Sequence, residues 1–355
     1  MPFQIIRNDI TKVKADAIVN TANPKPRIGR GTDSAIYEAA GKDQLLAQRK
    51  KIGSIAPGQA ASTDAFELNA RFIIHTVGPA WVDGNHGERD ILRSCYEESL
   101  TLADKLKCKS IAFPLIATGV YGFPKDDALN IALNTIGKFL LTHEMKVILV
   151  VFDRRALELS KQLIGDIKEY IDEHAAHLIR NAEYGGVPAT EYRRHRRAQM
   201  ETTEVLGSMP ESETVESDEE SVPPIANLPD LSGKSLDDIL GGAGDSFQQR
   251  LFHLIDERGV DDVTVYKKAN IDRKVFSSIR CKPDYKPKKK TAVAFAIALE
   301  LDLPTTLDLL SRAGIAFSPS DWFDLIISYF ITNKNYDIYE INATLFKYGQ
   351  QVLGE

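Results

Sequence analysis

The chain has 355 residues, of which 43% are hydrophobic and 26% are charged, a composition typical of folded proteins and long enough for two domains. Its formal net charge of -6 gives no overall sign of a nucleic-acid-binding protein. The three widely spaced cysteines, Cys95, Cys108 and Cys281, support neither a disulfide framework nor a zinc cluster. No stretch approaches about 18 apolar residues and the N-terminus carries early charges, so we expect a cytoplasmic protein without membrane contact.

Up to about residue 174, short apolar segments alternate with longer amphipathic ones. Strands are predicted at Ala17–Val19, Phe72–Val77, Ser110–Ala117 and Lys146–Phe152. Helices are predicted over Glu88–Leu106, with Ile91, Cys95, Leu102 and Leu106 on one face, and over Asp127–Leu141, with Ala128, Ala132, Ile136 and Leu140 on one face. This alternation predicts an α/β domain whose parallel or mixed sheet is covered by helices on both faces and binds ligands at the carboxyl ends of its strands.

The segment 175–245 loses this pattern. A basic cluster at Arg193–Arg197 is followed by Glu201–Val222, which holds eight acidic residues and no lysine or arginine. Such a stretch cannot bury enough apolar surface to offset the entropy lost on ordering. We therefore predict a flexible charged linker and favour a solvated tether over a binding motif.

The segment 246–355 is predicted to be an all-α domain of five short helices. Asp245 and Ser246 offer a cap for the first helix, and Gly259 offers its stop signal. The last part, Ser320–Leu353, contributes apolar residues that we expect to complete the core: Trp322, Phe323, Ile326, Ile327, Tyr329, Phe330 and Leu345.

Two glycine-bearing loops carry the chemistry of the first domain. One runs from Asn20 to Ile36, from a strand end into a helix, and the other, Ala117–Pro124, also follows a buried strand. Backbone amides of such loops, together with a helix N-terminus, suit a diphosphate because they present donors without requiring a cation. Either loop alone would more often be a structural turn, but a facing pair would clamp a diphosphate from both sides.

Taken together, the motifs resemble the macrodomain family, and its MacroD-type branch in particular. The matching segments are NDIT at Asn8–Thr11, NTAN at Asn20–Asn23, GTDSAIYEAAG at Gly31–Gly41, HTVGP at His75–Pro79, ATGVYGFP at Ala117–Pro124 and VVFD at Val150–Asp153. The resemblance covers about residues 1–174. It implies a three-layer α-β-α macrodomain with a mixed central sheet, and ADP-ribose or an ADP-ribosylated protein as the ligand.

The same resemblance assigns ligand-binding roles. Asp9 would accept a hydrogen bond from the adenine amino group, with Ile10 beside it and Phe152 against the ring. Gly29, Arg30 and Gly31 belong to the loop that approaches the phosphates from one side. The opposite loop would donate backbone hydrogen bonds, with Tyr121 closing over the distal ribose; its residues are Thr118, Gly119, Val120, Tyr121, Gly122 and Phe123.

Catalysis is expected from Asn20, Asn23 and Asp33, which would hydrolyse an ester at the distal ribose, either of an acidic side chain or of an acetyl group. Such an ester is already activated, so positioning and a diphosphate-held water suffice. The structural alternatives are a turn-forming asparagine and a helix N-cap at Asp33. His75 lies inside an apolar strand and is predicted to be a core histidine. No zinc or other cofactor is expected, because the loop lacks a cysteine and histidine pair.

Departures from the branch leave a second function open. Hydrolases of this branch have several consecutive glycines where this chain has Ile28–Gly31, and Pro24, Pro26 and Arg27 stiffen and charge the loop. Arg30 could bind phosphate or narrow the pocket. A non-catalytic reader of ADP-ribose or of a derivative is therefore the alternative to a hydrolase.

The run Thr264–Arg280 resembles the helix-turn-helix of lambda-repressor-like domains, with a cap at Asp272 and an apolar face formed by Val275, Phe276 and Ile279. Between Lys267 and Lys290 there are ten basic residues against two acidic ones. This segment could contact DNA or a protein partner, which would make the protein a regulator with a nucleotide-sensing arm. Residues expected at the contact are Asp272, Arg273, Lys274, Ser277 and Ser278.

Overall fold

A computed structural model describes residues 2–152, 163–172, 245–282 and 285–354. The segments Met1–Asp172 and Ser246–Glu355 together form one compact unit. The predicted linker at 175–245 lies outside the described residues except for its last position, and so do its basic cluster and its acidic segment. In the part of the chain that is described, no helix is both long and apolar enough to cross a membrane.

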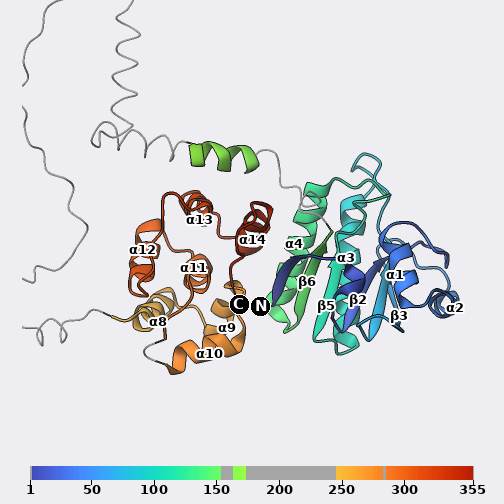
Figure 1. Cartoon of the computed structure of the whole chain (residues 1–355), viewed down its shortest axis with the longest axis horizontal. Helices are drawn as coiled ribbons and strands as arrows, with labels where there is room; N and C mark the ends of the chain where they lie inside the picture. Colours follow the sequence, from blue (N-terminus) through green and yellow to red (C-terminus); the bar gives the residue numbers. More distant parts are fainter. Residues whose placement is uncertain (1, 153–162, 173–244, 283–284, 355) are drawn as a thin grey trace, which may run out of the picture. The chain divides into compact units, whose positions relative to one another are not determined.

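A six-stranded mixed sheet forms the centre of the first half of the chain (Figure 1). In spatial order its strands are β1 (Phe3–Arg7), β6 (Lys146–Val151), β5 (Ser110–Pro114), β2 (Ala17–Thr21), β4 (Phe72–Thr76) and β3 (Ala60–Asp64). All neighbouring pairs are parallel except β3 and β4, which are antiparallel. The expected mixed sheet is therefore confirmed.

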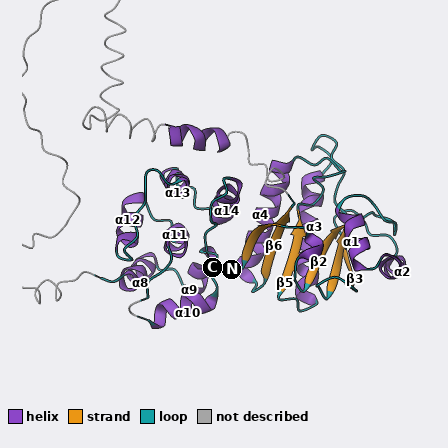
Figure 2. Ribbon diagram, viewed as in Figure 1, coloured by secondary structure: helices purple, strands orange, loops and turns teal. Residues whose placement is uncertain are grey.

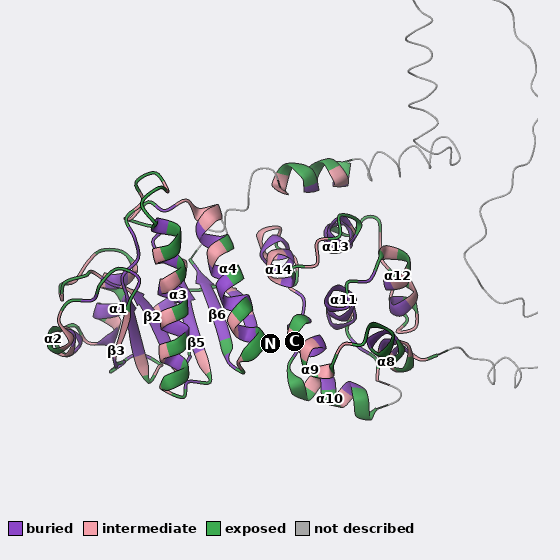
Figure 3. Cartoon of the chain, turned by 180° about the vertical axis from the view of Figure 1, so that it is seen from behind, coloured by how far each residue is buried: buried purple, intermediate pink, exposed green. Residues whose placement is uncertain are grey.

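Helices cover both faces of this sheet, as Figure 2 shows. On one face α3 (Glu88–Lys105) and α4 (Lys125–Thr142) pack on strand residues such as Val147 and Leu149. On the other face α1 (Thr32–Ala40), α2 (Lys42–Ile52) and the 3-10 helix η1 (Ile10–Lys12) pack on Ile148 and Val150. Successive residues of a strand point to opposite faces of the sheet. An uninterrupted apolar strand therefore has apolar side chains on both faces, and helices must cover both of them. Figure 3 shows the central strands β2, β5 and β6 as largely buried.

The sequence missed several elements and misplaced one helical face. The edge strands β1 and β3 and the helix α2 were not predicted. In α3 the buried stripe contains Leu92 and Tyr96 beside Cys95, while the expected Ile91 is only half-buried. The stripe is rotated because Glu88, the first residue of the helix, is itself buried. In α4 the expected face of Ala128, Ala132, Ile136 and Leu140 is buried as predicted.

Among residues 245–282 and 285–354 there are seven helices, which corrects the expected five. They are α8 (Phe247–Arg258), α9 (Asp262–Lys268), α10 (Arg273–Cys281), α11 (Lys289–Ala298), α12 (Leu303–Ser311), α13 (Trp322–Thr332) and α14 (Ile338–Lys347). The run Thr264–Arg280 contains two helices on either side of the expected turn at Asn270, which adopts a left-handed φ of 53°. The helix α14, capped by Asp337, was not predicted as a separate element. The predicted ends of α8 are confirmed, because Ser246 forms a capping box and Gly259 is its left-handed C-cap.

Most of the aromatic and aliphatic residues expected in the last part of the chain lie in a shared helical core, but Trp322 is 44% exposed. This helical region also contacts the sheet within the same compact unit. The Asn270 side chain accepts from the Phe3 amide at 2.9 Å and donates to the Phe3 carbonyl at 3.0 Å. The Tyr339 ring meets the Phe3 ring edge-on, with centroids 5.3 Å apart. At Phe3, the outward backbone amide and carbonyl of the edge strand β1 are thus paired by the Asn270 side chain as a neighbouring strand would pair them.

Candidate functional site

The predicted site residues gather along one edge of the sheet. Strands β1, β6, β5 and β2 are adjacent and parallel, so their carboxyl ends lie at the same edge. Asp9 follows β1, Phe152 follows β6, the loop 115–124 follows β5 and the loop 22–31 follows β2. The order of the strands therefore sets the order of these residues along the edge.

Asp33 is the most constrained acidic side chain at this edge. It lies in the first turn of α1 and is 2% exposed. Its Oδ1 accepts from Asn20 Nδ2 at 2.6 Å, and its Oδ2 accepts from the Gly29 amide at 2.5 Å. The N-cap of α1 is Gly31, which corrects the expectation that Asp33 could cap the helix. The carboxylate instead ties the loop after β2 to the strand.

Burial raises the pKa of Asp33 above its ordinary value, although the hydrogen bonds from Gly29 and Asn20 and the nearby charge of Arg49 oppose this shift. A carboxylate held in this way is poorly solvated and has both oxygens fixed in direction. Such a group can orient a hydroxyl or a water molecule without a strong basicity of its own.

Asn20 connects Asp33 to a buried histidine. Both Asn20 and His75 are 0% exposed, and Asn20 Nδ2 is 3.1 Å from His75 Nδ1. The other ring nitrogen, Nε2, is 3.0 Å from Thr63 Oγ1. Burial, with a smaller contribution from Arg49, lowers the pKa of His75 to about 3, so the ring is neutral near pH 7. His75 therefore has a partner at each nitrogen, as predicted for a core histidine.

The loop after β2 is held by hydrogen bonds from Arg49, whose side chain is buried and only 1% exposed. Its Nη2 donates to the carbonyls of Asn23 at 3.1 Å and Pro24 at 3.3 Å, and its Nη1 donates to the carbonyl of Gly53. A planar guanidinium can bind several carbonyl oxygens at once in this way. The Asn23 side chain is half-buried, and its Nδ2 donates to the Arg27 carbonyl at 3.3 Å.

Two glycines in this loop have physical reasons to be glycine. A Cβ on Gly29 would lie 2.6 Å from Asn23 Nδ2 and 3.1 Å from Asp33 Oδ2. Gly31 adopts a φ of 65°, which favours glycine over residues with side chains. Between them Arg30 is exposed to solvent, as is Arg27. The two basic side chains thus lie on the outer surface of the loop.

The loop after β5 offers a row of backbone donors. A hydrogen bond from the Gly122 amide to the Gly119 carbonyl, 3.0 Å long, closes the turn. Within the described residues, the amides of Gly119, Val120 and Tyr121 have no acceptor. Successive free amides in a turn form an anion-binding surface. The Phe123 side chain is only 2% exposed and its amide donates to the Ala117 carbonyl at 3.1 Å, so this predicted ligand residue offers no free donor there.

At the far end of the edge, Asp9 caps η1. Its Oδ1 accepts from the Thr11 hydroxyl at 2.8 Å and from the Thr11 amide at 3.0 Å, and these bonds lower the pKa of Asp9. Ile10 is buried beneath it, while Phe152 is 80% exposed. Asp9 is therefore ionised near pH 7 and Phe152 presents its ring to solvent.

Comparison with known proteins agrees with this architecture. The Macro domain family model matches residues 19–132. A macro domain-containing protein of Chlorobaculum tepidum is 44% identical over 162 residues, which cover 45% of this chain and 94% of that protein. The chain belongs to the Macro domain family.

Other macro domain relatives carry functional names. An O-acetyl-ADP-ribose deacetylase of Citrobacter rodentium is 42% identical over 167 residues, which cover 46% of this chain and 94% of that protein. Among solved structures, an Oceanobacillus iheyensis macrodomain with ADP matches at 39% identity and a TM-score of 0.41, covering 43% of this chain and 84% of that one. Each of these two proteins matches less than half of this chain.

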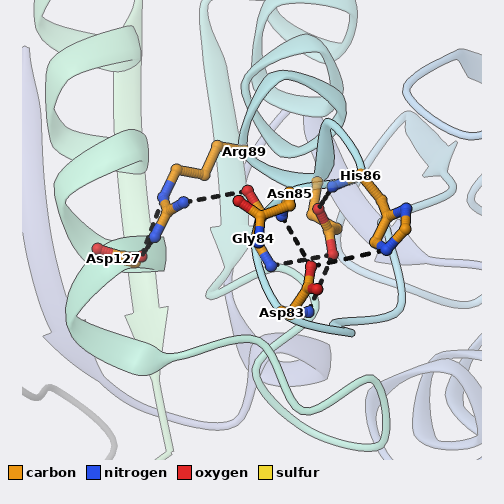
Figure 4. A network of polar contacts seen from close by, with 7 residues as sticks. Asp83, Gly84, Asn85, His86, Arg89 and Asp127 are labelled. Atoms are coloured by element: carbon orange, nitrogen blue, oxygen red, sulfur yellow. Dashed lines mark hydrogen bonds and ion pairs between the residues drawn. The ribbon is translucent and has the colours of Figure 1, made fainter.

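A second buried carboxylate, that of Glu88, binds the backbone of a loop next to the site. Glu88 is 2% exposed, and its Oε1 accepts from the amides of Val82, Asp83 and Gly84 at 3.2, 3.4 and 3.2 Å. Its Oε2 accepts from the His86 amide at 2.7 Å (Figure 4). Burial alone would raise the pKa of Glu88, but these backbone donors lower it to about 2. The loop 82–86 is wrapped around this carboxylate.

The same loop braces the turn after β5. The Trp81 amide donates to the Tyr121 carbonyl at 2.9 Å, and the Trp81 ring meets the Phe123 ring edge-on at 4.7 Å. Arg89 lies over the Trp81 ring at 5.3 Å and pairs with Asp127 at 2.6 Å (Figure 4). The backbone donors near Tyr121 are therefore held by side chains outside the loop.

Sequence reasoning missed Arg49, Thr63 and Glu88. Arg49 stands in the run Arg49-Lys50-Lys51, which reads as the solvated face of a helix, and Thr63 lies in the unpredicted strand β3. Glu88 was predicted only as the start of a helix. Nothing in their local patterns distinguishes these three residues from surface residues, because their partners are far away in the sequence or are backbone groups.

Proposed function

We propose that this protein binds ADP-ribose along the carboxyl edge of its sheet and hydrolyses O-acyl esters of ADP-ribose. The substrates would be O-acetyl-ADP-ribose and ADP-ribosylated acidic side chains. Water would cleave the ester to give ADP-ribose and the free carboxylic acid. The names of relatives such as the Citrobacter rodentium deacetylase support this activity, and the residues of the site supply a physical account of it.

The observation that carries the proposal is the fixed carboxylate of Asp33 at the same sheet edge as the free amides of Gly119, Val120 and Tyr121. The amides would bind the diphosphate, and Asp33 with Asn23 would hold the distal ribose and direct a water molecule toward the ester. Asp9 and Phe152, at the far end of the edge, would bind the adenine. The strand order therefore matches the order of the groups in ADP-ribose.

Titration calorimetry with the full chain tests binding, and incubation with O-acetyl-ADP-ribose or an ADP-ribosylated glutamate peptide tests turnover. We expect micromolar binding and release of ADP-ribose or acetate. Asp33→Ala should lower turnover by on the order of 100-fold while binding stays measurable. Asp43→Ala, at an exposed aspartate in the first turn of α2, is the matched control and should keep full activity. A wild-type protein that binds no ADP-ribose would refute the proposal.

A reader without turnover is the second candidate, and one contact favours it. The Asn23 side chain donates to the Arg27 carbonyl of its own loop, so one of its two amide protons is already used within the loop. In a reader, ADP-ribose would bind tightly and neither ester would be consumed. Arg27→Gly together with Arg30→Gly would then loosen the loop and restore slow turnover.

We also propose that the exposed face of α10 is the partner-binding part of the basic segment Lys267–Lys290. Arg273, Lys274 and Ser277 are exposed on this face. Lys267 and Lys289 are used inside the protein, because Lys267 donates to the Leu141 carbonyl and Lys289 pairs with a buried aspartate. A nucleic-acid phosphate backbone is the partner that two adjacent exposed basic residues suit.

A further inference from the structure

Four buried polar side chains form a continuous chain behind the proposed active site. They come from three strands and one helix, namely Thr63 of β3, His75 of β4, Asn20 of β2 and Asp33 of α1. The successive separations are 3.0 Å, 3.1 Å and 2.6 Å, and every member is at most 3% exposed. In the parallel pairing of β2 with β4, Asn20 stands opposite His75, so the sheet register itself sets the middle contact.

Hydrogen-bonding capacity allows only one consistent arrangement of protons in this chain. An ionised Asp33 can only accept, so Asn20 must turn its nitrogen toward it. The second proton of that nitrogen then points at His75 Nδ1, which must carry a lone pair. His75 therefore bears its proton on Nε2 and donates it to Thr63 Oγ1. Because His75 is neutral near pH 7, the acceptor at Nδ1 persists through the physiological range.

We propose that His75 and Thr63 are positioning residues that fix the orientation of the Asn20 amide and, through it, the carboxylate of Asp33. This inference rests on the proposed function, since it concerns the group that would direct water at the ester. A rotated Asn20 amide would place its oxygen against the Asp33 carboxylate and against the lone pair of the ring. Both contacts would be repulsive, so the histidine acceptor acts together with the Asp33 carboxylate to hold the productive orientation.

The Asn20 oxygen provides an independent sign of this selection. Among the described residues Asn20 Oδ1 has no hydrogen-bond partner, although it is fully buried. A buried amide with one unsatisfied oxygen costs free energy. The Asn20 amide nitrogen nevertheless donates to Asp33 in the structure. The other ionisable groups that act on Asp33 are Arg49 of α2 and Tyr37 of α1, and neither changes charge between pH 5 and pH 8.

A pair of substitutions at one position tests the proposal in the full chain. His75→Leu removes the acceptor while filling the space, and His75→Asn supplies an oxygen near the position of Nδ1. With O-acetyl-ADP-ribose as substrate, H75L should lower kcat by on the order of 10- to 100-fold with little change in KM. The acidic limb of its pH profile should move to higher pH, because the Asn20 donor to Asp33 is less firmly held and stabilises the ionised carboxylate less. H75N should recover most of kcat and the wild-type limb.

Equal losses in H75L and H75N with an unmoved pH profile would show that His75 only fills space, and would overturn the proposal. Ring-nitrogen NMR of the 15N-histidine-labelled wild type gives a readout that does not depend on activity. A proton on Nε2 and a bare Nδ1 are expected, and a proton on Nδ1 would also overturn the proposal. Carbon-13 titration of the Asp33 carboxyl should show a higher pKa in H75L than in the wild type. A wild type without turnover would refute the proposed function, and these two NMR results would still decide the role of His75.

Discussion

Nη2 of Arg49 lies 3.1 Å from the carbonyl oxygen of Asn23, beneath the loop that carries the proposed catalytic residues. Arg49 is the largest fully buried side chain among the described residues, and it also binds the carbonyls of Pro24 and Gly53. A loop with two prolines and two exposed arginines is thus held in place by the buried guanidinium of Arg49.

We predict that Arg49→Met destabilises the protein by roughly 2 kcal/mol or more, because buried carbonyl oxygens lose their donor. ADP-ribose affinity should fall at least tenfold, since the loop is no longer held in place. Arg49→Lys should give an intermediate loss, because a lysine keeps the charge but lacks the planar fork. Urea denaturation and calorimetric titration measure the two effects. Lys51→Met, at an exposed position of the same helix, should change neither quantity, and an equally strong effect there would contradict the assignment.

We predict that Gly29→Ala strongly lowers the turnover rate and has a smaller effect on the stability of the fold. The added Cβ would lie 2.6 Å from Asn23 Nδ2, so the asparagine or the backbone must move away from Asp33. Displacements of about 1 Å at reacting groups cost on the order of 100-fold in rate. Turnover of O-acetyl-ADP-ribose and the melting temperature are the measurements. Gly165→Ala, where a Cβ meets nothing within 4 Å, is the control that should keep the wild-type rate. Normal turnover in Gly29→Ala would mean that the observed position of the Asn23 side chain is not required for catalysis.

The loop wrapped around Glu88 predicts a specific acid sensitivity. Because the backbone donors lower the pKa of Glu88 to about 2 in the folded protein, its stabilising effect is complete above the ordinary value of 4.5 and is lost as the pH falls toward 2. Glu88→Gln should therefore reduce the free energy of unfolding most at neutral pH. Its difference from the wild type should shrink on acidification. Urea denaturation between pH 3 and pH 7 tests this, and a difference that does not vary with pH would disprove the assignment.

The sheet core could be predicted from the sequence because its strands and helices carry strong local patterns. The apolar runs of β5 and β6 and the 3.6-residue period of α4 are visible in a short window. The edge strands were missed because β3 is mostly polar and β1 stands among charged residues. Their assignment depends on pairing with strands that are distant in the sequence, for which a short window holds no signal.

The site was predictable in its composition but not in its connections. The motifs identified Asn20, Asn23 and Asp33, and the strand order brings them to the same edge of the sheet. That Asn20 contacts His75 follows from the register of β2 against β4, and its contact with Asp33 follows from the packing of α1 near β2; no local pattern encodes either. The +8 balance of Lys267–Lys290 overstates the free charge of this segment, because Lys289 is paired with the buried Asp324 at 2.5 Å. Formal charge along a sequence does not show which charges are already neutralised.

The last prediction concerns the charges that remain exposed on α10. We expect the full chain to bind a fluorescently labelled DNA duplex with an affinity that falls as salt rises, because phosphate contacts release counterions. Arg273→Glu combined with Lys274→Glu should weaken binding and reduce the salt slope by about 2, one for each lost contact. Fluorescence anisotropy at several salt concentrations gives both quantities.

Two controls make this result specific to α10. The double change Lys50→Glu and Lys51→Glu alters the net charge equally at an exposed end of α2 and should weaken duplex binding much less. Lys289 is unsuitable as a probe, because reversing its charge would leave Asp324, which is 1% exposed, beside a second carboxylate. If both double variants reduce binding equally, the duplex responds to overall charge and α10 is not its contact surface. If the wild type does not bind DNA at all, the proposal that α10 contacts a nucleic acid is refuted.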